Sequence, residues 1–418
     1  MSKSAHMTLS VSPDATDTSP NTMETNLFFS GALNLALILL VAQACWYLVF
    51  SPEGPVRLYT PNVGVSFVIT ILMVIHWGVD VFDYWPFNRR WLNESPSVIR
   101  GTVLLTTYIL VGFFVMFVFY YQMLGMYGPV FFSGPGLLSG GGLGQYPQTA
   151  TENACFAQVM MNTCIIFFTM LWLTTLGFRP WASLGRFARG LGVFFAGLVL
   201  AILAFSVLFF PHIAYQFYPA QIFMGAKPWW IDQAMTMSSQ FHFGWIVPAL
   251  VLLYWTHLLW EGRPWSCISN PGNRTAVMTV SVLALGYMIM IGGNMIMDWW
   301  WDLEAFEGGA TLENPAWRWN HIAEMAMFCH AAAFILANYF HNWPNVDNVA
   351  LRAVLRSAIA IVGGLALSYV YYELGPLLLG TVPGIAQEGD TTLAWTVMFL
   401  ILMFAHQKFF RGWPFQKR

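Results

Sequence analysis

Residues 187–210 read FARGLGVFFAGLVLAILAFSVLFF, and this stretch decides the class of the fold. After Arg189 it carries no charged residue, and it is long enough to cross the hydrocarbon core of a bilayer, which takes about 20 residues of α-helix. A helix in lipid satisfies all of its own backbone hydrogen bonds. The stretch therefore predicts a membrane-spanning helix.

Similar runs recur along the chain, so we expect an all-α integral membrane protein with about ten spans. The composition agrees, because only 9% of the 418 residues are charged and 57% are hydrophobic, whereas a soluble domain carries about 25% charged residues. The expected spans are approximately 27–50, 62–85, 98–121, 154–178, 187–210, 241–261, 274–297, 320–341, 353–376 and 393–410.

The ends of the chain are predicted to lie in the cytoplasm. Residues 1–26 are rich in Ser, Thr, Asp and Pro and lack an apolar core, so we expect a disordered cytoplasmic tail before a single polytopic domain, 27–418. Basic residues concentrate between even and odd spans, which places those loops inside. They are Arg89, Arg90, Arg100, Arg179, Arg186, Arg189, Arg263, Arg274, Arg352, Arg356, Lys408, Arg411, Lys417 and Arg418, against Arg57, Lys227 and Arg318 on the other side.

Each even span ends in a tryptophan–proline element, which predicts helix-pair repeats that stop at the cytoplasmic interface. The alternative is a set of independent helix stops. The elements are Trp85-Pro86, Pro180-Trp181, Pro264-Trp265, Trp343-Pro344 and Trp413-Pro414. The longer connections lie on the opposite side, where the glycine-rich part of 122–153 is expected to be flexible or a re-entrant flap.

Ionisable groups at membrane depth cost roughly 2.5–3.5 kcal/mol each at a helix centre, so they mark functional sites. An outer layer is predicted where spans six, seven and eight meet the extracytoplasmic face. Imidazole, carboxylate and thioether together suit copper, because thioether selects Cu(I). The predicted metal ligands are His242, Asp298, His321, Glu324, Asp302 and Met295.

An inner layer is predicted near the tryptophan–proline stops, with His76 and Asp80 one turn apart on span two. These groups could form a proton or ion path, or could simply cap and snorkel at the interface. The path candidates are His76, Asp80, His257, Glu261 and Glu373.

Four functions remain open from the sequence. The first is a copper-dependent membrane oxidoreductase, similar in style to the copper membrane monooxygenases, which also place Asp and His ligands among tryptophan-rich helices. The second is a transporter, of copper or another small solute, that uses both polar layers. The third is a b-type cytochrome, although the histidine spacings fit haem less well. The fourth is a non-catalytic subunit of a membrane complex.

Some classes of partner are not indicated. The net charge of −2 gives no sign of nucleic-acid binding, and no GxxxxGK[ST] motif predicts a nucleotide site. We expect a multi-pass protein of the cell membrane, the inner membrane of a bacterium, in contact with lipid and possible partner membrane or periplasmic subunits.

Overall fold

A computed structural model describes residues 20–51, 53–57, 61–139, 147–217, 225–300, 316–379 and 392–415. These residues form helices and connections, with no strand among them. Ten of the described helices are long and apolar enough to cross a membrane, which confirms the expected class of a multi-pass helical protein. They cover Phe28–Phe50, Asn62–Val81, Ser97–Leu124, Thr149–Leu176, Arg186–Leu208, Ser239–Leu258, Pro271–Met297, Arg318–Tyr339, Val349–Tyr371 and Thr392–Phe409.

The long helices are α1 (Pro20–Cys45), α2 (Pro61–His76), α4 (Ser97–Phe113), α7 (Pro147–Leu176), α8 (Arg186–Leu208), α12 (Ser239–Leu258), α13 (Pro271–Trp300), α15 (Ala316–Tyr339), α16 (Val349–Leu379) and α17 (Thr392–Phe404). Four of them continue as π-helical turns: α1 to Phe50, α2 to Val81, α4 to Leu124 and α17 to Phe409. The first helix, α1, begins at Pro20, within the predicted tail of residues 1–26, and residues 1–19 lie outside the described residues.

Shorter helices fill the connections. They are α3 (Arg90–Asn93), α5 (Gly125–Tyr127), α6 (Gly134–Ser139), α9 (Phe210–Phe217) and α11 (Pro228–Thr236). The described part of the glycine-rich segment folds back on the bundle: α6 packs against α7, Phe132 and Leu137 are buried, and the side-chain amide of Gln158 donates to the Phe132 carbonyl at 3.0 Å. Residues 140–146 lie outside the description.

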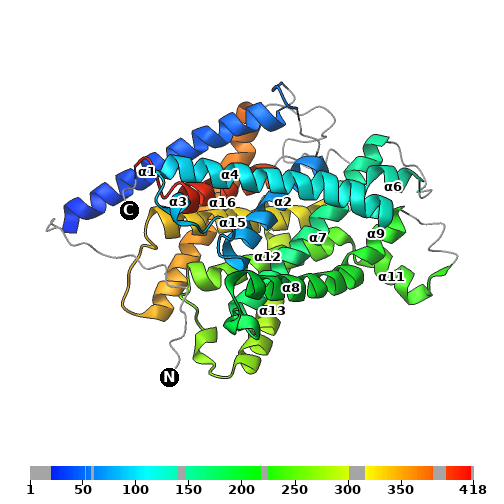
Figure 1. The fold of residues 1–418 in the computed structure, drawn as a ribbon. Coiled ribbons are helices and arrows are strands. Elements are labelled where there is room, and N and C mark those ends of the chain that lie inside the picture. The colour runs from blue at the N-terminus through cyan, green and yellow to red at the C-terminus, as the bar shows by residue number, and fades with distance from the viewer. Residues whose placement is uncertain are drawn as a thin grey trace.

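Five helices form a closed ring at the centre of the described bundle. In order, α2, α7, α12, α15 and α17 each pack against the next, and α17 packs against α2. Figure 1 shows α2, α7, α12 and α15 in the middle, with α1 and α4 along one side and α8 and α13 along the other. The ring helices are the buried ones: 72–89% of the residues in their most apolar windows are buried, against 22–28% in the others.

The other five long helices lie outside this ring and present apolar side chains to their surroundings. In the same order around the ring, α4 packs against α2, α8 against α7, α13 against α12, α16 against α15, and α1 against α17 and α15. Leu110, Leu203 and Val362 are each about two thirds exposed on outer helices. Such continuous apolar surface is compatible with lipid and not with water.

All five ring helices end in turns with the same backbone conformation. We call this end of the bundle the Trp–Pro end. The residue three before each proline has a left-handed φ: Asp83 (49°), Gly177 (62°), Glu261 (54°), His341 (51°) and Arg411 (55°). The polypeptide therefore turns in the same sense at the end of each ring helix. Each turn carries the aromatic residues that the sequence pattern singled out.

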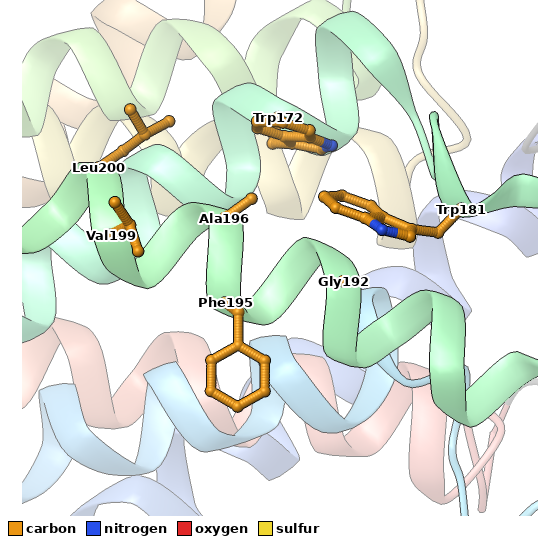
Figure 2. A pocket seen from close by; sticks show the side chains of 7 residues that line it. All are labelled: Trp172, Trp181, Gly192, Phe195, Ala196, Val199 and Leu200. Atoms are coloured by element: carbon orange, nitrogen blue, oxygen red, sulfur yellow. The ribbon is translucent and has the colours of Figure 1, made fainter.

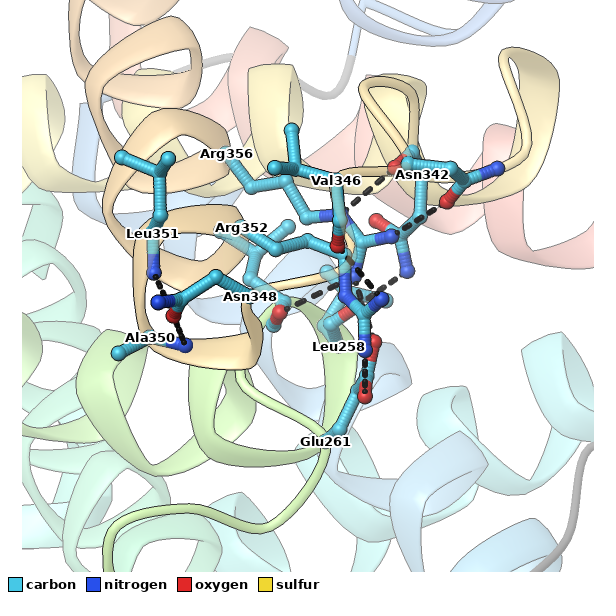
Figure 3. Close-up of polar contacts among 11 residues, drawn as sticks. Leu258, Glu261, Asn342, Val346, Asn348, Ala350, Leu351, Arg352 and Arg356 are labelled. Atoms are coloured by element: carbon cyan, nitrogen blue, oxygen red, sulfur yellow. Dashed lines mark hydrogen bonds and ion pairs between the residues drawn. The ribbon is translucent and has the colours of Figure 1, made fainter.

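Ion pairs at the Trp–Pro end connect the turn after α12 to the outer helix α16 (Figure 3). Arg352 and Arg356 of α16 bind the two carboxylate oxygens of Glu261 at 2.7 and 2.9 Å. Arg356 is itself buried and also donates to the Asn342 carbonyl at 2.6 Å. Burial raises the pKa of Glu261, but the hydrogen bonds and charges of the two arginines together hold this pKa below its ordinary value.

Candidate functional site

The strongest polar site lies inside the helix ring, where α2 meets α7. His76 is the last residue of α2, and Asp80 follows in the π-helical turn Trp77–Val81. The Nδ1 atom of His76 lies 2.9 Å from Asp80 Oδ2, and its Nε2 atom lies 2.9 Å from Thr169 Oγ1 on α7. The structure therefore brings together the predicted pair His76 and Asp80, and π-helical turns of this kind are frequent at functional sites.

One assignment of the hydrogen bonds follows from the contact between Thr169 and the backbone of its own helix. The Thr169 hydroxyl donates its single hydrogen to the Ile165 carbonyl at 2.6 Å, so towards His76 it can only accept. His76 Nε2 must then carry a hydrogen. The contact between Nδ1 and Asp80 contains a second hydrogen, on the ring or on the carboxyl group. The trio therefore accommodates one proton more than a neutral imidazole beside a carboxylate would carry.

Further hydrogen-bonded pairs continue this site along the α2–α7 interface, and we call the whole set the polar seam. Ser66 donates to Gln158 at 3.0 Å, and Asn162 donates to Thr70 at 2.8 Å. The backbone N–H of Asn62 donates to Glu152 at 2.8 Å at the end of α2 remote from the Trp–Pro turns. Polar pairs thus recur from one end of this interface to the other.

The widest gap between the α2 members of the polar seam lies between Thr70 and His76. Thr70 and His76 are separated by about 9 Å along the helix axis, and Met73, which is fully buried, occupies the same face of α2 between them. An apolar side chain cannot pass a proton along hydrogen bonds. Transfer across this point therefore requires a rearrangement or a transient water molecule.

Other ring helices bring aromatic and imidazole groups to Asp80. Its carboxylate is close enough to Tyr254 and His257 of α12 to act on both electrostatically. The Tyr254 ring lies 5.1 Å from the ring of His330 on α15. The Nδ1 atom of His330 is buried and has no hydrogen-bond partner among the described residues. The predicted path residue His257 therefore lies near the His76–Asp80 pair.

The predicted outer layer is assembled only in part. On α15, His321 Nδ1 lies 2.5 Å from Glu324 Oε2, and both side chains are buried. His242 on α12 is also buried, but its ring lies against Phe209 and Phe241. No group of three or more His, Cys, Asp or Glu side chains that could hold a metal ion occurs among the residues that the structure describes. His242 therefore does not join His321 and Glu324 in such a group.

The remaining predicted ligands lie elsewhere. Met295 is 55% exposed on α13, whereas Met290 and Met297 on the same helix are fully buried, so the thioether of Met295 faces away from the bundle. Asp298 lies on α13, but its side chain is outside the description, and Asp302 lies outside the described residues altogether. Glu373 is exposed near the end of α16. Glu261 belongs to the arginine cluster described above.

An apolar groove on the outside of the bundle is separate from these polar sites. Figure 2 shows it between the indoles of Trp172 and Trp181 and the α8 residues Gly192, Phe195, Ala196, Val199 and Leu200. The two indole rings stack at 5.5 Å, and a Cβ added at Gly192 would lie 2.3 Å from Trp181. Its place on the outer surface makes it a feature of the lipid-facing side.

Comparison of this chain with protein-family models, with curated proteins and with solved structures finds no match. The site must therefore be interpreted from its own chemistry.

Sequence reasoning missed most of the polar seam, although a signal was present. Asn62, Ser66 and Thr70 recur every four residues on span two, and Gln158 and Asn162 do so on span four. A polar stripe at this spacing lies on one face of a helix. Two such stripes in neighbouring spans could have been paired before the structure was known.

Proposed function

We propose that this protein is a secondary transporter of the cell membrane that couples the movement of a small solute to protons passing along the polar seam. The observation that supports this most directly is the His76–Asp80–Thr169 trio, in which a buried imidazole contacts a partly exposed carboxylate and could exchange one proton with it. Ionisable side chains within a membrane span cost free energy. Such a pair within a membrane span is therefore best explained by a role in ion movement.

We further propose that the Trp–Pro end faces the cytoplasm and that the ten crossings form five repeated helix pairs, each with one ring helix and one outer helix. The excess of basic residues near this end supports the orientation. Recurring contacts support the repeat: Asp83 pairs with Arg186 of α8, Glu261 with Arg352 of α16, and Arg100 of α4 donates to the Phe409 carbonyl. In each case the end of one ring helix contacts the start of an outer helix. That outer helix is three crossings further along the chain, if the first crossing is counted as following the tenth.

The interruption at Met73 fits a carrier better than an open proton channel. A carrier must prevent protons from passing freely, since free passage would uncouple proton movement from solute movement. Met73 is fully buried, so it separates the Asn162–Thr70 pair from the His76 trio in the described conformation. Each conformational cycle would then move a limited number of protons.

The test is proton entry into liposomes that contain the purified protein and a pH-sensitive dye, driven by a potassium diffusion potential. We expect slow but measurable entry above that of protein-free liposomes. Thr169→Val removes the acceptor for His76 Nε2, a hydrogen bond to a charged group worth about 1.5–3 kcal/mol. We therefore expect the proton entry rate to fall roughly tenfold or more, and Asp80→Asn to abolish it.

Thr163→Val is the matched control. Thr163 lies on the same helix, is also buried, and its hydroxyl donates only to the carbonyl of Val159, at 2.9 Å. The same isosteric change there leaves His76 untouched, so the rate should stay at the wild-type value. Equal slowing by both substitutions, or wild-type entry no faster than in empty liposomes, would refute the proposal.

A second candidate function, a copper site in a membrane oxidoreductase or copper carrier, is favoured by one specific observation. The His321–Glu324 pair adjoins a buried cluster in which Met290, Met297 and Met325 pack together with Ile322. A carboxylate on one imidazole nitrogen is typical of metal-bound histidine, and thioethers favour Cu(I).

Metal analysis and an optical spectrum of the purified protein test this second candidate. We expect about one copper per chain, lost in His321→Ala and weakened in Met297→Leu, with Met295→Leu unchanged because Met295 faces outward. Copper content that is insensitive to His321 would exclude this site. A haem absorption band would instead support the cytochrome hypothesis.

A further inference from the structure

We propose that Asp80 also binds the transported solute, and that this solute is a small monovalent cation exchanged for the proton of His76. The inference rests on the proton-linked transport proposed above and adds the class of solute. It follows from the accessibility of the two partners, the charges around them and the proton count of the trio.

Asp80 is accessible where His76 is not. The His76 side chain is 2% exposed, whereas the Asp80 side chain is 26% exposed. Of the two carboxylate oxygens, Oδ2 makes the contact with His76. A small ion can therefore reach the carboxylate without displacing the imidazole.

Among the described residues, His76 is the one basic side chain that forms an ion pair with Asp80. The nearby arginines are engaged elsewhere: Arg100 of α4 donates to the carbonyls of Lys408 and Phe409, and Arg186 and Arg189 of α8 contact Asp83. His406, beyond α17, stacks on Tyr339. The groups that face the trio from neighbouring elements are Thr169 of α7, Tyr254 and His257 of α12, Tyr108 of α4 and Tyr84 of the adjoining turn.

This arrangement makes proton and cation compete. With the proton bound, imidazolium and carboxylate form a neutral pair. When a monovalent cation M⁺ binds the carboxylate, two positive charges would share one negative charge in a poorly solvated site, which is unfavourable. The balanced exchange is His76-H⁺·Asp80⁻ + M⁺ → His76 + Asp80⁻·M⁺ + H⁺. One charge replaces another, so the exchange is electroneutral at the site.

Two sources of cation share this chemistry. An alkali ion would use the carboxylate and polar oxygens such as the Tyr254 hydroxyl. A small ammonium compound would bind the same carboxylate and also lie against the aromatic face of Tyr254, which is stabilising for ammonium groups. The Tyr254 ring, which packs 5.1 Å from the ring of His330, is the aromatic face we propose for this role.

The experiment measures proton release on cation binding by the detergent-purified protein, without any transport. Sodium chloride or methylammonium chloride is added to weakly buffered protein with a pH indicator, in separate runs from about pH 5 to about pH 8, around the ordinary titration range of histidine. N-methylglucamine chloride, whose cation is bulky, controls for ionic strength. We expect release that approaches one proton per chain at its maximum within this pH range, and none in His76→Gln or Asp80→Asn.

Glu94→Gln is the matched carboxylate control, because Glu94 is exposed and pairs with Arg90 at 2.7 Å outside the ring; it should release protons as the wild type does. Release by sodium alone identifies an alkali cation, and release by methylammonium alone identifies an ammonium compound. No release by either cation, or release that persists in Asp80→Asn, overturns the inference. Proton entry into liposomes without cation-driven release refutes only this inference, whereas release without proton entry refutes only the transport proposal.

Discussion

Adjacent glycines on α16 provide a sharp test of how closely the ring and outer helices pack. A Cβ added at Gly364 would lie 2.4 Å from the Cα and 2.5 Å from the N of Cys329 on α15. Ordinary carbon contacts lie at about 3.5–4.0 Å, so the two backbones would have to separate by more than about 1 Å. A Cβ at Gly363 would meet only the Ala332 Cβ, at 3.4 Å.

The expected free energies follow from these distances. Overpacking costs about 1–3 kcal/mol, while alanine is favoured over glycine in a helix by about 1 kcal/mol. Gly364→Ala should therefore lower the free energy of unfolding by up to about 2 kcal/mol, and Gly363→Ala should raise it by about 1 kcal/mol, so the two variants differ by the overpacking cost of about 1–3 kcal/mol. At roughly 2 °C per kcal/mol for a large chain, the two unfolding midpoints should differ by about 2–6 °C.

Thermal unfolding in detergent, followed with a thiol-reactive dye, measures this difference. Cys155 and Cys164 are buried and become reactive on unfolding, whereas the exposed Cys267 is replaced by serine in all samples to lower the background. Equal midpoints, or a higher midpoint for Gly364→Ala than for Gly363→Ala, would refute the close contact between α15 and α16.

Three further changes have expected outcomes. Glu261→Gln removes the carboxylate that binds Arg352 and Arg356. The pKa of Glu261 is lower in the folded protein than its ordinary value. The stability that this carboxylate contributes is therefore present above the ordinary carboxylate pKa and is lost as pH falls through the lowered pKa. The midpoint of the variant should be lower than that of the wild type at pH 7, and the gap should shrink below about pH 4. Gly192→Ala would displace Trp181 and should lower the midpoint, while at Gly185 an added Cβ meets no described atom within 4 Å, so Gly185→Ala should not. Met73→Ser should raise proton entry into liposomes by bridging the interruption in the polar seam, and an unchanged rate would argue against that pathway.

The membrane crossings were predictable because a span of about 20 apolar residues has no other use in a chain with so few charges. The expected and observed spans agree closely, for example 187–210 against Arg186–Leu208 and 274–297 against Pro271–Met297. The first predicted span, 27–50, agrees with Phe28–Phe50, and α1 itself begins earlier, at Pro20, because a helix can start before it enters the bilayer.

The division into ring and outer helices was not predicted, although the helices of the ring contain more polar residues. Hydropathy measures average polarity, whereas position in a bundle depends on which faces meet other helices. His76 and Asp80 were found because their spacing places them on one face of span two. Their partner Thr169 was not, because the pairing of spans two and four is a property of tertiary packing.

For the predicted outer metal site, the sequence grouped residues that the structure does not bring together. His242, His321 and Met295 occur at similar depths on their spans, but equal depth does not fix the direction in which a side chain points. His321 and Glu324 share a face of one helix, and the structure pairs them. Met295 turns outward, while Met290 and Met297, at positions seven residues apart, turn inward. Depth must therefore be combined with helical phase before a shared ligand is inferred.

The most buried crossing, α7, also carries half of the polar seam. The crossing formed by α7 is the most covered of the ten, with 89% of its apolar window buried among the described residues, so protein rather than lipid surrounds the polar seam. In the proposed transport cycle, a proton at His76 would leave either along the seam past Met73 or through Asp80, whose side chain retains accessible surface. A site built only for stability would gain from apolar replacements of the same shape. A buried imidazole beside one accessible carboxylate is instead the arrangement that the proposed alternation of proton and cation would use.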